Sequence, residues 1–93
     1  MLLLYNILWN GSGEEFREYI ERTKGIINEI EGVEYKGVYG TSDEWNWTFI
    51  IKSSDYEKVL QAYRTFIKKY GPAKITKAKT IILHTFKELG FTE

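Results

Sequence analysis

The chain has 93 residues, of which 43% are hydrophobic and 16% aromatic, and its 13 basic and 13 acidic residues leave no net charge. This length suits one compact domain over residues 1–93, and neutrality removes the electrostatic footprint typical of nucleic-acid-binding proteins. The sequence contains no cysteine and a single histidine, which excludes disulfides, thiolate metal sites and a multi-histidine metal site within one chain.

The beginning of the chain predicts a strand followed by a helix. Leu2–Trp9 reads as an apolar strand, and Ser12 with Glu15 forms the pattern of a capping box, in which each side chain satisfies the other's backbone amide. Gly25 inside the helix indicates a close contact, and Gly32 supplies the stop. The apolar residues at helical spacing are Phe16, Tyr19, Ile20, Thr23, Ile27 and Ile30.

The middle of the chain predicts a hairpin and a second helix. Val33–Gly40 and Trp45–Lys52 read as two strands joined by a polar connection. Ser54 and Glu57 predict a second capping box. The apolar stripe of the helix that follows ends at Gly71-Pro72, because proline cannot continue the pattern. Its members are Tyr56, Val59, Leu60, Tyr63, Phe66, Ile67 and Tyr70.

The end of the chain completes a recognisable element order. Ile75–Thr85 reads as a fourth strand, and Phe86–Glu93 as a short tail that forms one turn. With right-handed crossovers, the order β-α-β-β-α-β predicts the ferredoxin-like α+β fold, a four-stranded antiparallel sheet with both helices on one face.

The first and third strands are apolar on both alternating faces. Leu2–Trp9 carries Leu2, Leu4 and Leu8 on one parity, interrupted by Asn6, and only apolar or aromatic residues on the other. A sheet with one wet face alternates apolar with polar residues, so the second face needs cover as well. Two helices can cover only one face. We therefore expect a homodimer that packs through the open sheet face and encloses a space between two sheets.

Parts of the chain resemble a known sensing module. They are Gly40-Thr41-Ser42-Asp43, the helix Tyr56–Tyr70 with Gly71, and Thr80-Ile81-Ile82-Leu83. Together they look like the ligand-sensing module of the Lrp/AsnC regulators, a branch of the dimeric α/β-barrel superfamily. The chain lacks the helix-turn-helix that such regulators carry ahead of the module, so direct DNA binding is not implied. The resemblance implies that Gly40 and Asp43 lie near an effector site between subunits.

A second resemblance is to the antibiotic-biosynthesis-type monooxygenases and related haem-degrading enzymes. These proteins are similar in size and element order, and often place a catalytic asparagine on the first strand, where Asn6 stands. The haem-degrading members also use a histidine on the second helix and a tryptophan at the end of the third strand. Here the second helix has no histidine and Ile51 stands in place of that tryptophan, so haem chemistry is not expected.

Several single residues are candidates for chemistry. Asn6 is costly to bury unless its carboxamide finds partners, so it either bonds within the protein or holds a substrate oxygen in a cavity. His84 is a candidate proton carrier, or a residue of a surface or interface. The expected aromatic wall of the cavity, which could equally fill a dimer core, is Trp45, Trp47 and Phe49, with Trp9 and Tyr35 or Tyr39 beside them.

We therefore expect a cytoplasmic homodimer, without cofactor or metal, that binds a small apolar or aromatic ligand between its sheets. The expected ligand-binding residues are Asn6, Trp9, Tyr35, Gly40, Asp43, Trp45, Trp47 and Phe49. The alternative is a cofactor-independent monooxygenase or isomerase that uses Asn6, Trp47 and His84 in the same cavity. A lesser alternative is an RNA-binding module, which shares this element order but whose third-strand signature is missing here. No apolar stretch approaches the roughly 20 residues that span a membrane, and abundant lysine, glutamate and isoleucine favour a thermophilic source.

Overall fold

A computed structural model of this chain describes residues 1–69 and 74–92, without the side chains at 62, 63 and 65–69. The predicted helix stop at Gly71-Pro72, and most of the second half of the stripe on the second helix, therefore lie outside the described residues. The elements are β1 (Leu2–Trp9), α1 (Gly13–Asn28), β2 (Val33–Gly40), β3 (Trp47–Ser53), α2 (Tyr56–Lys69) and β4 (Ile75–Leu83).

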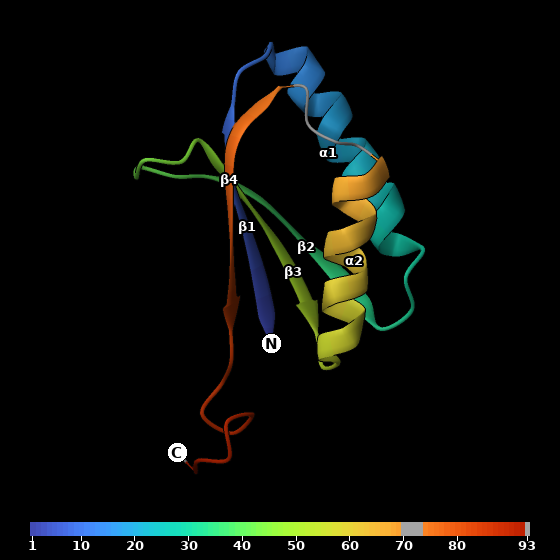
Figure 1. The fold of residues 1–93 in the computed structure, drawn as a ribbon, viewed down its shortest axis with the longest axis vertical. Coiled ribbons are helices and arrows are strands. Elements are labelled where there is room, and N and C mark those ends of the chain that lie inside the picture. Colours follow the sequence, from blue (N-terminus) through green and yellow to red (C-terminus); the bar gives the residue numbers. More distant parts are fainter. Residues whose placement is uncertain (70–73, 93) are drawn as a thin grey trace.

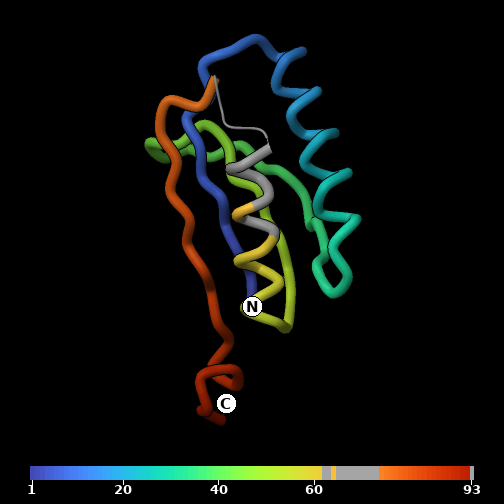
Figure 2. The backbone as a smooth tube through the Cα atoms, turned by 45° about the vertical axis from the view of Figure 1, so that its right-hand side comes forward, coloured from blue at the N-terminus to red at the C-terminus, as the bar shows by residue number. Residues whose placement is uncertain are grey.

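The described strands form one antiparallel sheet in the order β2-β3-β1-β4. Both helices lie on the same face of this sheet, which makes a two-layer molecule (Figure 1). Its principal extents are 45 × 30 × 18 Å, so the smallest dimension corresponds to one sheet and one layer of helices. The central strands β1 and β3 are flanked by β4 and β2, and the tail after β4 continues past the beginning of β1 (Figure 2). The predicted ferredoxin-like α+β fold is confirmed.

The first helix begins as the sequence predicts. Ser12 Oγ accepts a hydrogen bond from the Glu15 amide, and Glu15 Oε1 accepts one from the Ser12 amide, both at 3.1 Å. α1 ends at Asn28, and Gly32 lies in the following turn with φ 83°, a conformation that glycine adopts without a steric penalty. The close contact predicted for Gly25 is wrong, because a Cβ atom there would meet no atom of the described residues within 4 Å.

Three predicted boundaries were wrong, each for a local reason. β3 begins at Trp47 and not at Trp45, because the Asn46 side chain accepts a 2.6 Å hydrogen bond from the Trp9 amide and interrupts the regular ladder. α2 begins after Asp55, whose Oδ1 accepts from the Glu57 amide at 2.9 Å, so Asp55 and not Ser54 supplies the cap. β4 ends at Leu83 instead of residue 85, where the tail begins its turn.

The core lies between the sheet and the helices. Leu3, Tyr5 and Ile7 point from β1 toward the helices, and Phe49 and Ile51 do the same from β3. From the helices, the buried apolar side chains that meet them are Phe16, Tyr19, Ile27 and Val59. Tyr56, in contrast, is 46% exposed and lies outside this core, although the sequence placed it in the stripe of the second helix.

Candidate functional site

The strand register separates the sheet residues into two faces. Residues paired across antiparallel strands point to the same side, and successive residues of a strand alternate. The face turned away from the helices, called the open face below, receives the β1 residues that alternate with the core positions. Its described members are Leu2, Leu4, Asn6, Leu8, Glu34, Tyr39, Thr48, Ile50, Lys52, Lys77, Lys79, Ile81 and Leu83.

Most of the predicted aromatic wall lies on the helix side of the sheet instead. Trp47 and Phe49 alternate with the open-face residues of β3 and pack under α1. The Trp47 ring stacks on Phe16 at 4.8 Å between centroids, and Trp9 lies 5.1 Å from Phe16. Tyr35 joins the same group, with its ring 6.5 Å from Phe49. These rings fill the core between the sheet and the helices, where the helix layer already covers them.

The tyrosines of this layer are held in their neutral form. Burial raises the pKa of Tyr19, and the neighbouring Tyr5 hydroxyl, hydrogen-bonded to it, adds to the rise. Burial is also the main cause that raises the pKa of Tyr35, with a further contribution from the charge of Glu21. Because each shift moves the pKa above the ordinary value of 10.0, neither phenol is available as a base at neutral pH.

Asn6 lies on the open face, in the middle of the sheet, and is only 8% exposed. Its Nδ2 donates to the Lys79 carbonyl oxygen at 3.2 Å and, more weakly, to the Leu4 carbonyl oxygen at 3.5 Å. Thr48 lies directly opposite on β3, and its buried hydroxyl has no hydrogen-bond partner within the described part of the chain. Asn6 therefore bonds into the protein through its amide nitrogen, beside a hydroxyl with unused hydrogen-bonding capacity.

The connection between β2 and β3 projects on the open-face side of the sheet, away from the helices (Figure 1). Trp45 lies in this connection and is 8% exposed, with the Lys77 ammonium 5.3 Å from its ring centroid. Asp43 is exposed there, and its Oδ1 accepts from the Glu44 amide at 2.7 Å. Gly40 belongs to the other side, since it pairs with Trp47 and a Cβ atom would lie 3.4 Å from that ring.

His84 lies at the lower end of the open face, just after β4. It lines a pocket of about 380 Å³, called the end pocket below, that sequence reasoning missed. Since Leu83 pairs with Leu2, four strand residues at about 3.3 Å each separate this end from Asn6, a distance of roughly 13 Å. The end pocket is lined by Met1, Leu2, Lys36, Lys52, Leu83, His84, Thr85 and Glu88.

The three predicted catalytic residues are therefore not brought together within one copy of the chain. Asn6 lies on the open face, Trp47 on the helix face, and His84 beyond the strand end. Lys36 of the end pocket was missed because it occupies the point where the β2 register shifts between Tyr35 and Gly37. The alternation of apolar and polar residues carries no signal for such an irregularity.

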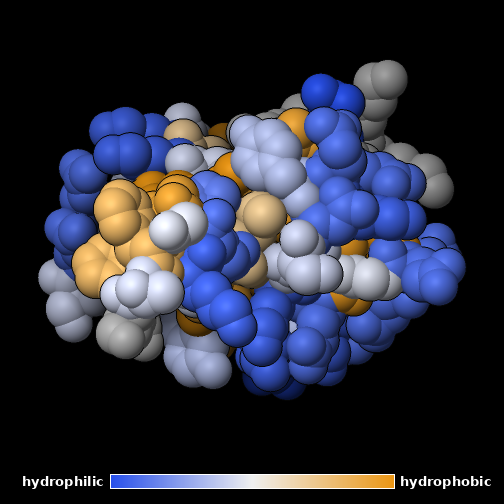
Figure 3. All heavy atoms as spheres, turned by 90° about the horizontal axis from the view of Figure 1, so that it is seen from below, coloured by the Kyte–Doolittle hydropathy of each residue, from blue (hydrophilic) through white to orange (hydrophobic). Residues whose placement is uncertain are grey.

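Apolar side chains also gather on the C-terminal tail. Phe86, Leu89 and Phe91 are 60%, 55% and 60% exposed, and the lower end of the molecule shows a corresponding apolar patch bordered by hydrophilic atoms (Figure 3). The predicted single turn is confirmed by the hydrogen bond from the Leu89 amide to the Thr85 carbonyl oxygen at 3.2 Å. A 2.8 Å ion pair between the Met1 amino group and Glu88 ties this turn to β1.

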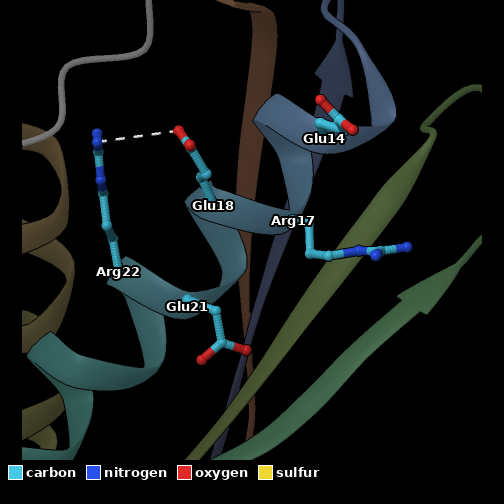
Figure 4. A pocket seen from close by; sticks show the side chains of 5 residues that line it. All are labelled: Glu14, Arg17, Glu18, Glu21 and Arg22. Atoms are coloured by element: carbon cyan, nitrogen blue, oxygen red, sulfur yellow. Dashed lines mark ion pairs between the residues drawn. The ribbon is translucent and has the colours of Figure 1, made fainter.

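A second hollow, of about 560 Å³, lies over the outer surface of α1 and is lined only by charged residues. Its side chains point outward in different directions, and the Arg22 guanidinium approaches Glu18 at 4.0 Å (Figure 4). The lining residues are Glu14, Arg17, Glu18, Glu21 and Arg22. Because these groups do not converge on one point, we interpret this surface as a solvated helix face.

Neither a metal site nor a membrane-spanning helix is found among the described residues. No group of three or more histidine, cysteine, aspartate or glutamate side chains is placed to hold a metal ion there. No described helix is long and apolar enough to cross a membrane.

Comparison with known proteins bears on the fold. No protein-family model matches this chain, and no curated protein matches it. Several solved structures, in contrast, match this chain. SnoaB from Streptomyces nogalater, a cofactor-independent oxygenase, superposes with a TM-score of 0.65 at 16% identity, over 90% of this chain and 92% of that one.

Two other solved structures have the same fold with different functions. An AsnC family transcriptional regulator from Agrobacterium tumefaciens matches with a TM-score of 0.52 at 15% identity. The match covers 86% of this chain but only 47% of the regulator, so this chain spans about half of its length. The 30S ribosomal protein S6 from Thermotoga maritima matches with a TM-score of 0.51 at 24% identity, over 86% and 82% of the two chains. These likenesses establish the class of the protein as a ferredoxin-like α+β domain, as the sequence predicted.

Proposed function

We propose that this chain is a self-associating binding module, in which two copies pack through their open faces and hold a small apolar or aromatic ligand between the sheets. The observation that supports the proposal most directly is a group of apolar side chains on a face that no described helix covers. Ile81 and Leu83 of β4 are 38% and 46% exposed there. Exposed apolar surface gathered on one face is typical of a protein interface.

A row of aliphatic side chains crosses the middle of the open face. Ile81 of β4 pairs with Leu4 of β1, and Leu4 pairs with Ile50 of β3. At about 4.8 Å between strands and about 3.3 Å per residue, the four strands span roughly 19 by 26 Å, or about 500 Å² in projection. A standard interface covers about 800 Å² of each partner. The projecting connection at 41–46 and the exposed tail supply apolar surface beyond the sheet itself.

The polar groups of this face suit an enclosed ligand site. Asn6 uses its amide nitrogen within the protein, and no partner for its Oδ1 atom is found among residues 1–69 and 74–92. The neighbouring Thr48 hydroxyl has none there either. In a dimer these atoms would lie between two apolar sheets, where a few placed polar groups orient a bound molecule.

The enzymatic alternative has less support from the geometry. A monooxygenase or isomerase that used Asn6, Trp47 and His84 would need these side chains around one cavity, and they lie on two faces and beyond a strand end. The likeness to SnoaB, at 16% identity, concerns the fold and carries no catalytic residue to this chain.

The RNA-binding alternative has less support too. Single-stranded RNA is bound on such sheets by aromatic side chains on which bases stack. The open-face positions of the two central strands carry no aromatic side chain; they are Leu2, Leu4, Asn6, Leu8, Thr48, Ile50 and Lys52.

The proposal is tested by measuring mass and ligand binding together. Sedimentation equilibrium is expected to show a dimer at micromolar concentration, and the neutral probe N-phenyl-1-naphthylamine is expected to fluoresce in proportion to the dimer. A folded monomer at about millimolar concentration would overturn the proposal. Turnover of quinols under oxygen that Asn6→Ala abolishes would instead favour the enzyme.

A further inference from the structure

The end pocket is built where four separate parts of the chain meet. Leu2 and Leu83, which pair across β1 and β4, form its apolar floor. Lys52 enters from β3, where it also pairs with Leu2. Lys36 enters from β2 at the register shift between Tyr35 and Gly37. The volume of about 380 Å³ is in the range of sites for small molecules.

The charges around this pocket do not cancel. Two acidic side chains are near, and each already has a cationic partner. Glu34 Oε1 lies 3.3 Å from Lys36 Nζ, and Glu88 Oε2 lies 2.8 Å from the Met1 amino group. No ion pair of Lys52 is found among the residues that the structure describes, although Glu34 stands opposite it on β2. With these two pairs neutralised, the positive charge of Lys52 remains over an apolar floor.

His84 adds a second polar group to the same rim. It follows Leu83 directly, and it is exposed without a hydrogen bond to any described residue. The Glu88 carboxylate stays occupied, because it also accepts a hydrogen bond from the Thr85 amide at 3.0 Å. The pocket therefore offers donors, Lys52 and His84, on one side and hydrocarbon on the other.

We propose that the end pocket binds the carboxylate of a small organic acid, with Lys52 as its ionic partner and the apolar part of the ligand on Leu2 and Leu83. A lysine is a point charge with three donors and suits a carboxylate at the edge of an apolar surface. This inference rests on the proposed ligand-binding function and adds the chemical class of the ligand. Its lining residues come from one copy of the chain, although Leu2, Lys52 and Leu83 belong to the open face, so binding and association are measured separately.

The probe for the test is phenylacetate, which joins one carboxylate to one apolar ring. Titration is followed by calorimetry and by ¹H–¹⁵N spectra. Binding with a submillimolar dissociation constant is expected, with shifts concentrated at Leu2, Leu83 and His84. Lys52→Ala is expected to weaken binding about 10-fold, the scale of one charge-assisted hydrogen bond. The matched control is Lys74→Ala, which removes an exposed lysine just before β4, at the other end of the sheet, and is expected to leave the affinity within about twofold.

Phenylacetamide separates charge recognition from simple burial of the ring. It is expected to bind at least 10-fold more weakly than phenylacetate. Equal binding of the two compounds, an unchanged affinity in Lys52→Ala, or the absence of shifts around the pocket would each overturn the inference. Sedimentation of the same samples distinguishes the two proposals. A dimer that does not bind phenylacetate contradicts only the carboxylate site. A monomer that binds phenylacetate contradicts only the proposed association.

Discussion

The substitution Ile81→Lys tests the open face where its apolar row is most exposed. Ile81 lies at the edge strand, pairs with Leu4, and keeps 38% of its surface exposed in a single copy. The methylene stem of lysine can cover Leu4 much as isoleucine does, while its ammonium reaches solvent. We therefore expect the fold of each copy to survive, and the association of two copies to be lost.

The expected change in the dimer dissociation constant follows from the exposed fraction of the Ile81 side chain. Full burial of an isoleucine side chain contributes about 1.5–3 kcal/mol, so burying the 38% that is still exposed contributes about 0.6–1.1 kcal/mol per copy. A symmetric dimer interface uses the same residue twice, which gives about 1–2 kcal/mol and a roughly 5- to 30-fold change in the dimer dissociation constant. Enclosing two ammonium groups adds a desolvation cost of several kcal/mol. The expected total effect of Ile81→Lys is at least about 100-fold.

Sedimentation equilibrium measures the dissociation constant, and circular dichroism checks that the fold is kept. The matched control is Tyr56→Lys, which introduces the same charge at a side chain that is 46% exposed and belongs to the helix layer. We expect this control to dimerise as the unaltered protein does. If Ile81→Lys dimerises equally well, or if Tyr56→Lys dissociates the dimer, the open face is not the interface and the reasoning fails.

Three further outcomes are expected. Gly25→Ala should raise the free energy of unfolding by about 0.5–1 kcal/mol in urea titrations, because the site is an exposed helix interior with free space; a loss would contradict this. Asn6→Asp should cost about 1–3 kcal/mol, because a carboxylate cannot donate to the Lys79 carbonyl, whereas unchanged stability would show that this bond is unimportant. The Met1 ammonium and the Thr85 amide lower the pKa of Glu88 from 4.5 to about 2, so the stabilisation of the tail is present above pH 4.5 and is lost progressively toward pH 2. Glu88→Gln should remove this acid dependence in amide exchange of the tail, and an unaltered profile would refute the assignment.

Much of the local structure followed from the sequence alone. The bounds of β1 and β2 match the predicted strands Leu2–Trp9 and Val33–Gly40, and the Ser12–Glu15 capping box formed as expected. These features depend on residues that are close along the chain, because caps, helical spacing and turns are local interactions. The element order, joined to the handedness of crossovers, was then sufficient for the ferredoxin-like topology.

Which face of the sheet packs under the helices could not be predicted in that way. Both parities of β1 are apolar, so composition alone gives no preference for Leu3, Tyr5 and Ile7 over Leu4 and Leu8 as the core set. The choice depends on how α1 and α2 pack on the sheet, which is a long-range property. Its consequence was large, because it moved most of the expected aromatic wall under the helices and left an open face whose apolar side chains are mainly aliphatic.

Irregular backbone also decided on which side of the sheet single residues lie, and the sequence did not predict it. Asn46 bonds to the Trp9 amide and separates Trp45 from Trp47, and the register shift in β2 brings Lys36 to the pocket that Lys52 and His84 share. Hydrophobic periodicity assumes an uninterrupted strand, so one extra residue changes the face on which every later side chain lies. The sequence by itself therefore determined which elements form and in what order. The tertiary structure decided which of their side chains meet, because that depends on register and on the packing of the helices.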